Sequence, residues 1–118
     1  MQTRDARREK NMTRTPVMNN TKWDELRLAM YALGEQSPRW RTRDVENGYV
    51  CPWDGEWFYH FRDGGYETVD WVEIEATSIQ QRDIVLKRLH EIHVPGEAST
   101  QGFIVFGYAP DGRAIEYL

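Results

Sequence analysis

Two segments of the sequence repeat apolar residues at the spacing of an amphipathic helix, and they stand on either side of a longer stretch of strand-like segments. The first helix is expected to begin at Asn20 or Thr21, because either side chain can cap it. The second is expected to begin at Ser78, which can form a capping box with Gln81. Each helix has one apolar side and must therefore pack against another layer. The apolar positions are Trp23, Leu26, Met30 and Leu33 in the first helix and Val85, Leu86, Leu89 and Ile92 in the second.

The other segments alternate in polarity or are rich in β-branched and aromatic residues, and turn residues separate them. The element order α-β-β-β-β-α-β-β predicts an α+β fold, with a mainly antiparallel sheet and two packed helices. We expect Trp57, Tyr59 and Phe61 to share the core face of one strand. We expect the last two strands to pair as a hairpin around residues 109–112. The expected strands span residues 40–45, 49–51, 56–61, 67–76, 103–108 and 113–118.

The segment at residues 67–76 changes phase along its length. Val69 and Trp71 share one face of an ideal strand, whereas Val72 and Ile74 share the opposite face. Either this strand is buried on both faces, or a β-bulge re-aims its side chains. Several acidic residues also lie on it, which argues against complete burial.

The chain has 118 residues, which is the size of one domain. The first 17 residues are basic and lack apolar periodicity, so we expect a disordered tail at 1–17 and a folded domain at 18–118. The tail holds five basic and two acidic residues, a net charge of +3; since the whole chain carries −4, the domain carries −7. An acidic domain favours a partner with a basic surface over nucleic acid or an anionic membrane.

The single cysteine, Cys51, excludes a disulfide within the chain and indicates a reducing environment. No segment approaches the roughly 20 consecutive apolar residues of a membrane-spanning helix. The N-terminal residues lack the apolar segment of a signal peptide. We therefore expect a cytoplasmic protein.

The sequence offers only weak candidates for chemistry. Cys51 and His60, with Asp54 nearby, could form a nucleophile and a base, but no family signature surrounds the cysteine. His90 and His93 lie three residues apart on a helix, yet a zinc site needs at least one more ligand. We therefore predict no enzyme, no metal and no cofactor. The alternatives are a small enzyme acting on a sugar or nucleotide, and a module that binds carbohydrate or peptide.

Two motifs carry a family resemblance: N-N-T-K-W-D-E-L-R at residues 19–27 and W-D-G-E-W-F-Y-H-F-R at residues 53–62. The chain from residue 18 onward resembles a family of small uncharacterised bacterial proteins that occur near genes for secreted polymorphic toxins. The resemblance implies an immunity protein, which binds a cognate toxin domain and neutralises it without catalysis.

A stretch rich in rings and carboxylates, residues 55–75, is expected to place some of its rings in the core and to present the others, among carboxylates, as a contact surface for such a toxin. Carboxylates steer the association with a basic partner, and exposed rings supply most of the binding energy. We expect Trp53, in a turn, and Tyr66, at the tip of a hairpin, to be exposed. The predicted partner-binding residues are Trp53, Asp54, Glu56, Tyr66, Glu67, Asp70 and Glu73.

Overall fold

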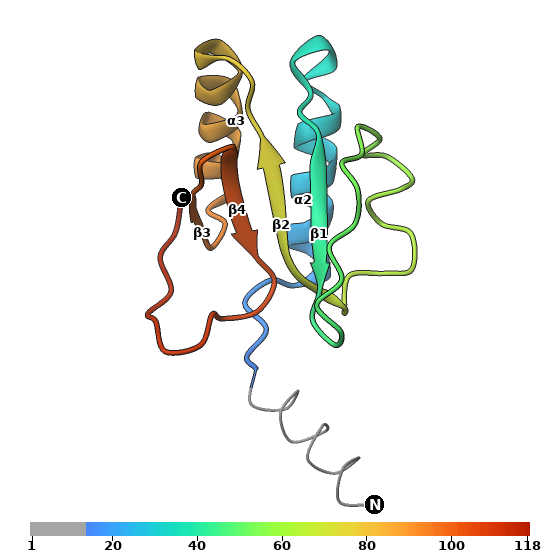
Figure 1. Ribbon diagram of the computed structural model, residues 1–118. Helices are drawn as coiled ribbons and strands as arrows, with labels where there is room; N and C mark the ends of the chain where they lie inside the picture. The colour runs from blue at the N-terminus through green and yellow to red at the C-terminus, as the bar shows by residue number, and fades with distance from the viewer. Residues whose placement is uncertain (1–13) are drawn as a thin grey trace, which may run out of the picture.

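The protein, in a computed structural model that describes residues 14–118, is built of two layers (Figure 1). One layer is a four-stranded antiparallel sheet with strand order β1-β2-β4-β3. Both long helices lie on the same face of that sheet (Figure 1). This arrangement confirms the predicted α+β class, with an antiparallel sheet and two packed helices. The elements are α2 (Asn20–Tyr31), η1 (Gly34–Gln36), β1 (Trp40–Asp44), β2 (Val69–Glu75), α3 (Ile79–Ile92), β3 (Gly96–Ala98) and β4 (Gly102–Phe106).

Side-chain caps define where the two helices begin. The side chain of Asn19 accepts a hydrogen bond from the backbone N–H of Lys22, so α2 is capped one residue earlier than expected. Ser78 caps α3 by accepting from the N–H of Gln81 at 3.0 Å. The side chain of Gln81 reaches back to the N–H of Thr77, which completes a variant of the predicted capping box.

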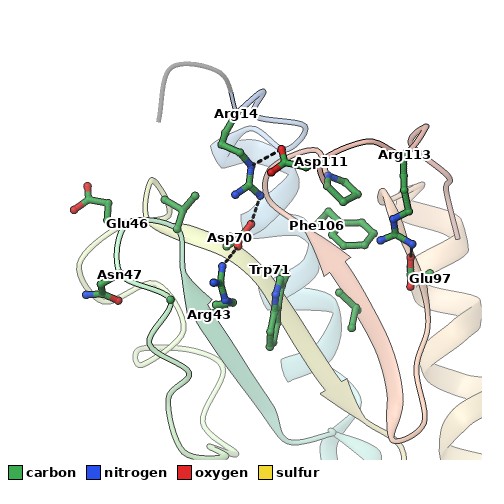
Figure 2. A pocket seen from close by; sticks show the side chains of 14 residues that line it. Arg14, Arg43, Glu46, Asn47, Asp70, Trp71, Glu97, Phe106, Asp111 and Arg113 are labelled. Carbon is green, nitrogen blue, oxygen red and sulfur yellow. Dashed lines mark hydrogen bonds and ion pairs between the residues drawn. The ribbon is translucent and has the colours of Figure 1, made fainter. Parts of the chain in front are cut away.

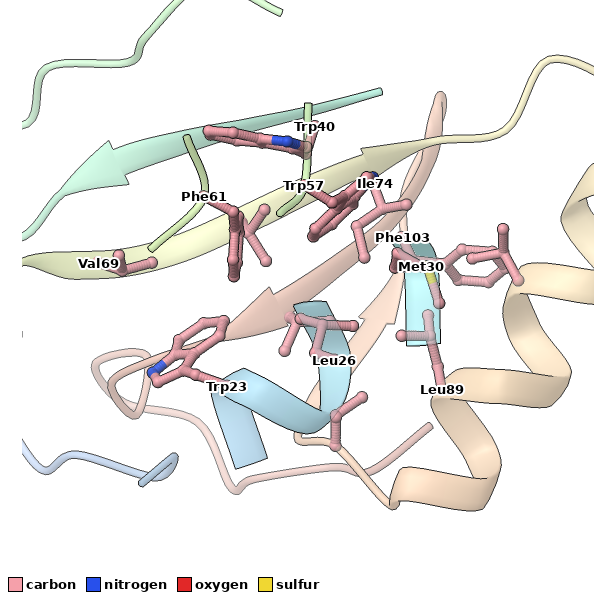
Figure 3. Packing of buried hydrophobic residues seen from close by; sticks show 14 of the residues in the cluster. Trp23, Leu26, Met30, Trp40, Trp57, Phe61, Val69, Ile74, Leu89 and Phe103 are labelled. Carbon is pink, nitrogen blue, oxygen red and sulfur yellow. The ribbon is translucent and has the colours of Figure 1, made fainter. Parts of the chain in front are cut away.

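The core lies between the helices and one face of the sheet (Figure 3). Leu26 and Met30 of α2 are fully buried, and they belong to the same core cluster as Ile74 of the inner strand β2. Burying each such side chain contributes roughly 1.5–3 kcal/mol to folding. Leu86, which we predicted in the buried stripe of α3, is 38% exposed, so that prediction is wrong. The buried cluster also contains Trp23, Trp40, Trp57, Phe61, Tyr66, Val69, Val72, Val85, Leu89, Val94, Phe103 and Val105.

The predicted strand at residues 56–61 is wrong, because this segment folds into consecutive turns. The carboxylate of Glu56 accepts hydrogen bonds from the backbone N–H groups of residues 58, 59 and 60, so the chain curls around it. Trp57 and Phe61 then point into the core, while Tyr59 is 64% exposed. Residues 53–67, called the 53–67 loop below, pack beside the sheet and α2 (Figure 1).

The predicted strand at 49–51 also does not form. Val50 makes only an isolated bridge to Arg43, and Asp54 makes another to Trp40. These two bridges cover the outer edge of β1. In the bridge between Trp40 and Asp54, each backbone N–H donates a hydrogen bond to the backbone carbonyl of the other residue. The edge strand is therefore closed by its own following loop rather than by a further strand.

The predicted hairpin between residues 103–108 and 113–118 is wrong as well. β4 pairs instead with β3, which precedes it in the chain. Only three residues join these strands, so their pairing closes a short loop at small entropic cost. Residues 113–118 do not pair with β4. They make one isolated bridge, between Pro95 and Tyr117.

The phase change at residues 67–76 arises from a β-bulge, one of the two alternatives that the sequence left open. Trp71 lies opposite Arg43 and Val69 lies opposite Asp44, so Asp70 is the extra residue. The bulge turns Val69 into the core and sends Trp71 to the opposite face. Gly107 donates its N–H to the Asp70 carbonyl at 2.8 Å, and a Cβ atom at this glycine would overlap the Val69 carbonyl oxygen.

Residues 14–17 belong to the fold, which corrects the predicted tail at 1–17 for these four positions. The N–H of Val17 donates to the Gly107 carbonyl at 2.9 Å, and the N–H of Ala109 donates to the Thr15 carbonyl at 2.8 Å. Arg14 forms an ion pair with the buried carboxylate of Asp70 at 2.7 Å. The rest of the predicted tail, residues 1–13, lies outside the described residues.

A truncation tests the contribution of this segment. A chain that starts at Met18 is expected to lose about 2 kcal/mol of unfolding free energy relative to one that starts at Arg14, because Asp70 loses a buried partner. Urea denaturation of the two chains, each with an initiator methionine, measures the difference. Equal stability would show that residues 14–17 add nothing to the fold.

Candidate functional site

The face of the sheet opposite α2 and α3, called the helix-free face below, carries a set of charged and aromatic side chains. Side chains alternate between the two faces of a strand, so the neighbours of the core residues point here. β4 shows this alternation: Phe103 and Val105 enter the core, while Ile104 and Phe106 lie outside the core cluster. The side chains on this face include Arg41, Arg43, Trp71, Glu73, Glu75, Glu97, Ile104 and Phe106.

Arginine–carboxylate pairs connect β1 and the residue before it to β2. Arg39 binds Glu75 through two hydrogen bonds of 2.9 Å. Arg41 lies directly opposite Glu73 in the strand register and pairs with it at 2.8 Å. Arg43 pairs with Asp70 in the bulge. The Arg39–Glu75 and Arg41–Glu73 pairs form because two antiparallel strands place basic residues and acidic residues of the same period side by side, whereas Arg43 lies opposite Trp71 and pairs with the bulge residue Asp70.

In these pairs the arginine is the more exposed member. The Arg41 side chain is 31% exposed and that of Glu73 only 8%, while Arg43 is 38% exposed against 5% for Asp70. The guanidinium groups therefore cover the carboxylates. The surface exposed here to a partner protein is basic and aromatic. Trp53 is part of this cover, since its ring lies 4.4 Å from the guanidinium carbon of Arg41.

A groove of about 890 Å³ lies at the end of the helix-free face near the bulge (Figure 2). Trp71, Ile104 and Phe106 line it, and Trp71 is only half-buried. Figure 2 shows Trp71 and Phe106 between two charged groups. One is the cluster of Arg14, Asp70 and Arg43, and the other is the pair of Arg113 and Glu97 at 3.0 Å.

Three of the predicted contact residues, Tyr66, Asp70 and Glu73, are buried, so the expectation that Tyr66 is exposed is wrong. Asp70 and Glu73 are 4% and 6% exposed, and both are neutralised by arginines. Tyr66 packs on Trp23 and donates its hydroxyl to the Asp24 carboxylate at 2.6 Å. Burial, followed by this hydrogen bond, raises the pKa of Tyr66 to about 12.

The remaining predicted residues all belong to the 53–67 loop, whose first residue, Trp53, also contributes to the helix-free face. Trp53 is half-buried on the face, whereas Glu67 is exposed at the end of the loop. Asp54 accepts from the backbone N–H of Glu56 at 2.7 Å and pairs with His60 at 2.9 Å. The structure therefore brings Trp53, Asp70 and Glu73 to the helix-free face. Asp54 and Glu56 instead form hydrogen bonds within the 53–67 loop and stabilise its turns.

Hydrogen bonds within the 53–67 loop shift the pKa values of Glu56 and His60. Hydrogen bonds from backbone N–H groups, that of His60 first, lower the pKa of Glu56. The hydrogen bond and the negative charge of Asp54 raise the pKa of His60 above its ordinary value of 6.5.

This raised pKa predicts a small pH dependence. The His60–Asp54 interaction stabilises the fold fully below the ordinary pKa of 6.5 and is lost as the pH rises through the higher folded-state value. Urea denaturation from pH 5.5 to 8.5 should show a decrease in stability that disappears in His60→Gln. An NMR titration that gives His60 a pKa at or below 6.5 would contradict this.

The weak candidates for chemistry have other partners in the structure. The Cys51 sulfur accepts from the N–H of Thr42 at 3.2 Å, while His60 is bound to Asp54. The His93 ring stacks on Tyr117 with centroids 4.5 Å apart. Within residues 14–118 no three His, Cys, Asp or Glu side chains gather as metal ligands could. Over the same residues no helix has the length and apolar character needed to cross a bilayer.

The sequence analysis missed the residues that dominate the exposed surface of this face. Arg41, Arg43 and Trp71 were not among the predicted contacts, nor were Arg14 and Arg113. The available signal was the period of two shared by Arg39, Arg41 and Arg43 and by Glu73 and Glu75, which pair once two antiparallel strands lie side by side.

Residues 6–112 match a family of unknown function, DUF6678, and the chain belongs to this family. The match begins well before residue 18, so it includes part of the segment that we predicted to be a tail. Neither the comparison with curated proteins nor the comparison with solved structures finds a match.

Proposed function

Taking the chain as a member of that family, we propose that it acts by binding another protein through the helix-free face. Following the sequence resemblance, we propose that this partner is a cognate toxin domain, which the protein neutralises in the bacterial cytoplasm without catalysis. The proposal names the same partner as the sequence analysis but a different surface.

One observation carries the proposal: arginines and tryptophans cover the helix-free face. Tryptophan, tyrosine and arginine are the residues most enriched at the energetic centres of protein interfaces. Trp53 and Trp71 are held partly exposed, and Arg41 is clamped between Glu73 and the Trp53 ring. Side chains fixed in this way lose little further entropy when a partner binds.

A second group of rings lies elsewhere on the surface and does not favour the alternative of a carbohydrate-binding module. Tyr31 and Phe58 are tilted by 55° to each other, and Phe58 and Tyr59 by 73°. A sugar-binding platform needs a flat row of rings, which this cluster does not provide. Tyr59 instead offers a control, since it is exposed and lies outside the helix-free face.

The proposal is tested by co-expressing candidate toxin domains with the protein and scoring cell survival. The wild-type chain is expected to rescue cells from one such domain, and the double variant Trp53→Ala/Trp71→Ala is expected to fail. Each ring is expected to contribute about 2 kcal/mol, or roughly 30-fold in affinity. Tyr59→Ala should rescue like the wild type. Full rescue by the double variant, with Tyr59→Ala inactive, would place the interface outside this face.

A further inference from the structure

We infer that the groove beside Trp71 binds a carboxylate group of the partner protein, either an acidic side chain or a C-terminal carboxylate. The inference rests on the proposed function, because it names the chemistry that the helix-free face recognises. It also reverses the partner charge that the acidic composition of the chain predicted.

The first argument is the charge balance of the groove. Arg14 binds one carboxylate oxygen of Asp70, and Arg43 binds the other. Two guanidinium groups thus share one buried carboxylate, as Figure 2 shows, so these three residues together carry a charge of +1, beside the exposed carboxylates of Glu46 and Asp111 that also line the groove. A guanidinium has five N–H donors, and each of these two uses one on Asp70.

The second argument concerns one remaining donor, the Nε of Arg14. Among residues 14–118, the buried Nε of Arg14 has no hydrogen-bond partner. The carboxylate of Asp111 lies 3.8 Å from this Nε, on a side chain that is 86% exposed. Such an exposed and distant pair contributes little, so an incoming carboxylate can replace it.

The third argument is the apolar wall beside these donors. Trp71 and Phe106 extend from the arginine cluster toward Arg113, whose guanidinium carbon lies 5.8 Å from the Phe106 ring. An apolar surface next to a guanidinium excludes water, and charge-assisted hydrogen bonds are stronger where water is excluded. The groove therefore suits a carboxylate that is carried on an apolar or aromatic segment.

Glu46 and Asp111 are exposed at the groove itself, whereas other exposed acids of the protein lie away from it. Exposed acids occur on α2, η1, the 53–67 loop and α3, as with Glu25, Glu35, Asp63 and Asp83. At physiological ionic strength fields from exposed charges are screened beyond about 8 Å. Direct contacts in the groove then decide which group binds there.

The test is an NMR titration of the ¹⁵N-labelled full chain with three amidated hexapeptides, made of glutamate, glutamine or lysine. A hexaglutamine peptide with a free C-terminus separates a terminal carboxylate from acidic side chains. We expect the hexaglutamate or the free-acid peptide to shift the Trp71 indole N–H, and the amidated glutamine and lysine peptides to leave it unchanged. Arg43→Gln should weaken binding at least about fivefold, and Arg88→Gln, an exposed arginine on α3, should not.

The variant Asp111→Asn provides a second test of the inference, in which every arginine stays in place. This substitution removes the carboxylate that competes for Arg14, so the carboxylate peptide should bind about twofold more tightly. The inference is overturned if the lysine peptide shifts Trp71 as strongly, or if Arg43→Gln binds like the wild type. Toxin rescue that depends on the two tryptophans, without any peptide binding, would overturn the carboxylate inference and leave the proposed function standing.

Discussion

Trp57→Ala is expected to lower the free energy of unfolding by about 4 kcal/mol, whereas Tyr59→Ala should change it by less than about 0.5 kcal/mol. Trp57 is 1% exposed, donates its indole N–H to the Pro38 carbonyl at 2.7 Å, and packs on Phe61 with ring centroids 4.7 Å apart. Its removal leaves a cavity and an unpaired carbonyl. Urea denaturation of both variants measures the two effects.

This pair of variants distinguishes the observed turns from the strand that the alternating pattern predicted. In that strand Trp57 and Tyr59 share the core face, and both substitutions would be severe. Losses of similar size at the two positions would therefore contradict the turn structure around Glu56. Unchanged denaturant slopes would show that both variants unfold from the same compact state.

Asp70→Asn is expected to destabilise the protein by about 3 kcal/mol, although asparagine has nearly the same shape. The substitution leaves Arg14 and Arg43 without a negative partner, and the Arg14 side chain is only 18% exposed. Glu75→Gln is the matched control, because its partner Arg39 is 55% exposed. That change should lower stability by less than about 1 kcal/mol.

Thermal or urea denaturation of the two variants, at the same pH and salt concentration, provides the comparison. Equal effects would mean that the Asp70 cluster behaves like an ordinary surface pair. The groove would then lack the buried anchor that holds Arg14 and Arg43 in place. An effect of Asp70→Asn that disappears in the chain starting at Met18 would assign the loss to Arg14 alone.

The helices were predictable because their signals are local. The apolar spacing of Trp23, Leu26 and Met30 and the cap at Ser78 act within a few residues, and both survive unchanged in the fold. The strand at residues 56–61 was mispredicted because alternation is also produced by turns. Three backbone N–H groups found a nearer acceptor in the Glu56 carboxylate than in a neighbouring strand.

The candidate site was predictable only in part, because exposure depends on strand pairing. The sequence predicted an exposed Trp53, which is half-buried in the structure, and it offered a bulge as one of two explanations of the phase change at Val69. It does not specify which strand lies beside β2. Once β1 lies there, Arg41 covers Glu73 and Arg43 covers Asp70, so the predicted acidic surface becomes a basic one.

The central claim is that the helix-free face is the binding surface, and protection of its arginines from chemical modification tests it most directly. The purified complex of the protein with the toxin domain that it neutralises is treated with phenylglyoxal. Modified arginines are then identified by mass spectrometry. The account predicts that Arg41 and Arg43 become protected in the complex, while Arg62 in the 53–67 loop and Arg88 on α3, both exposed, react as in the free protein. Protection of Arg62 or Arg88 with unchanged reaction at Arg41 and Arg43 would contradict it.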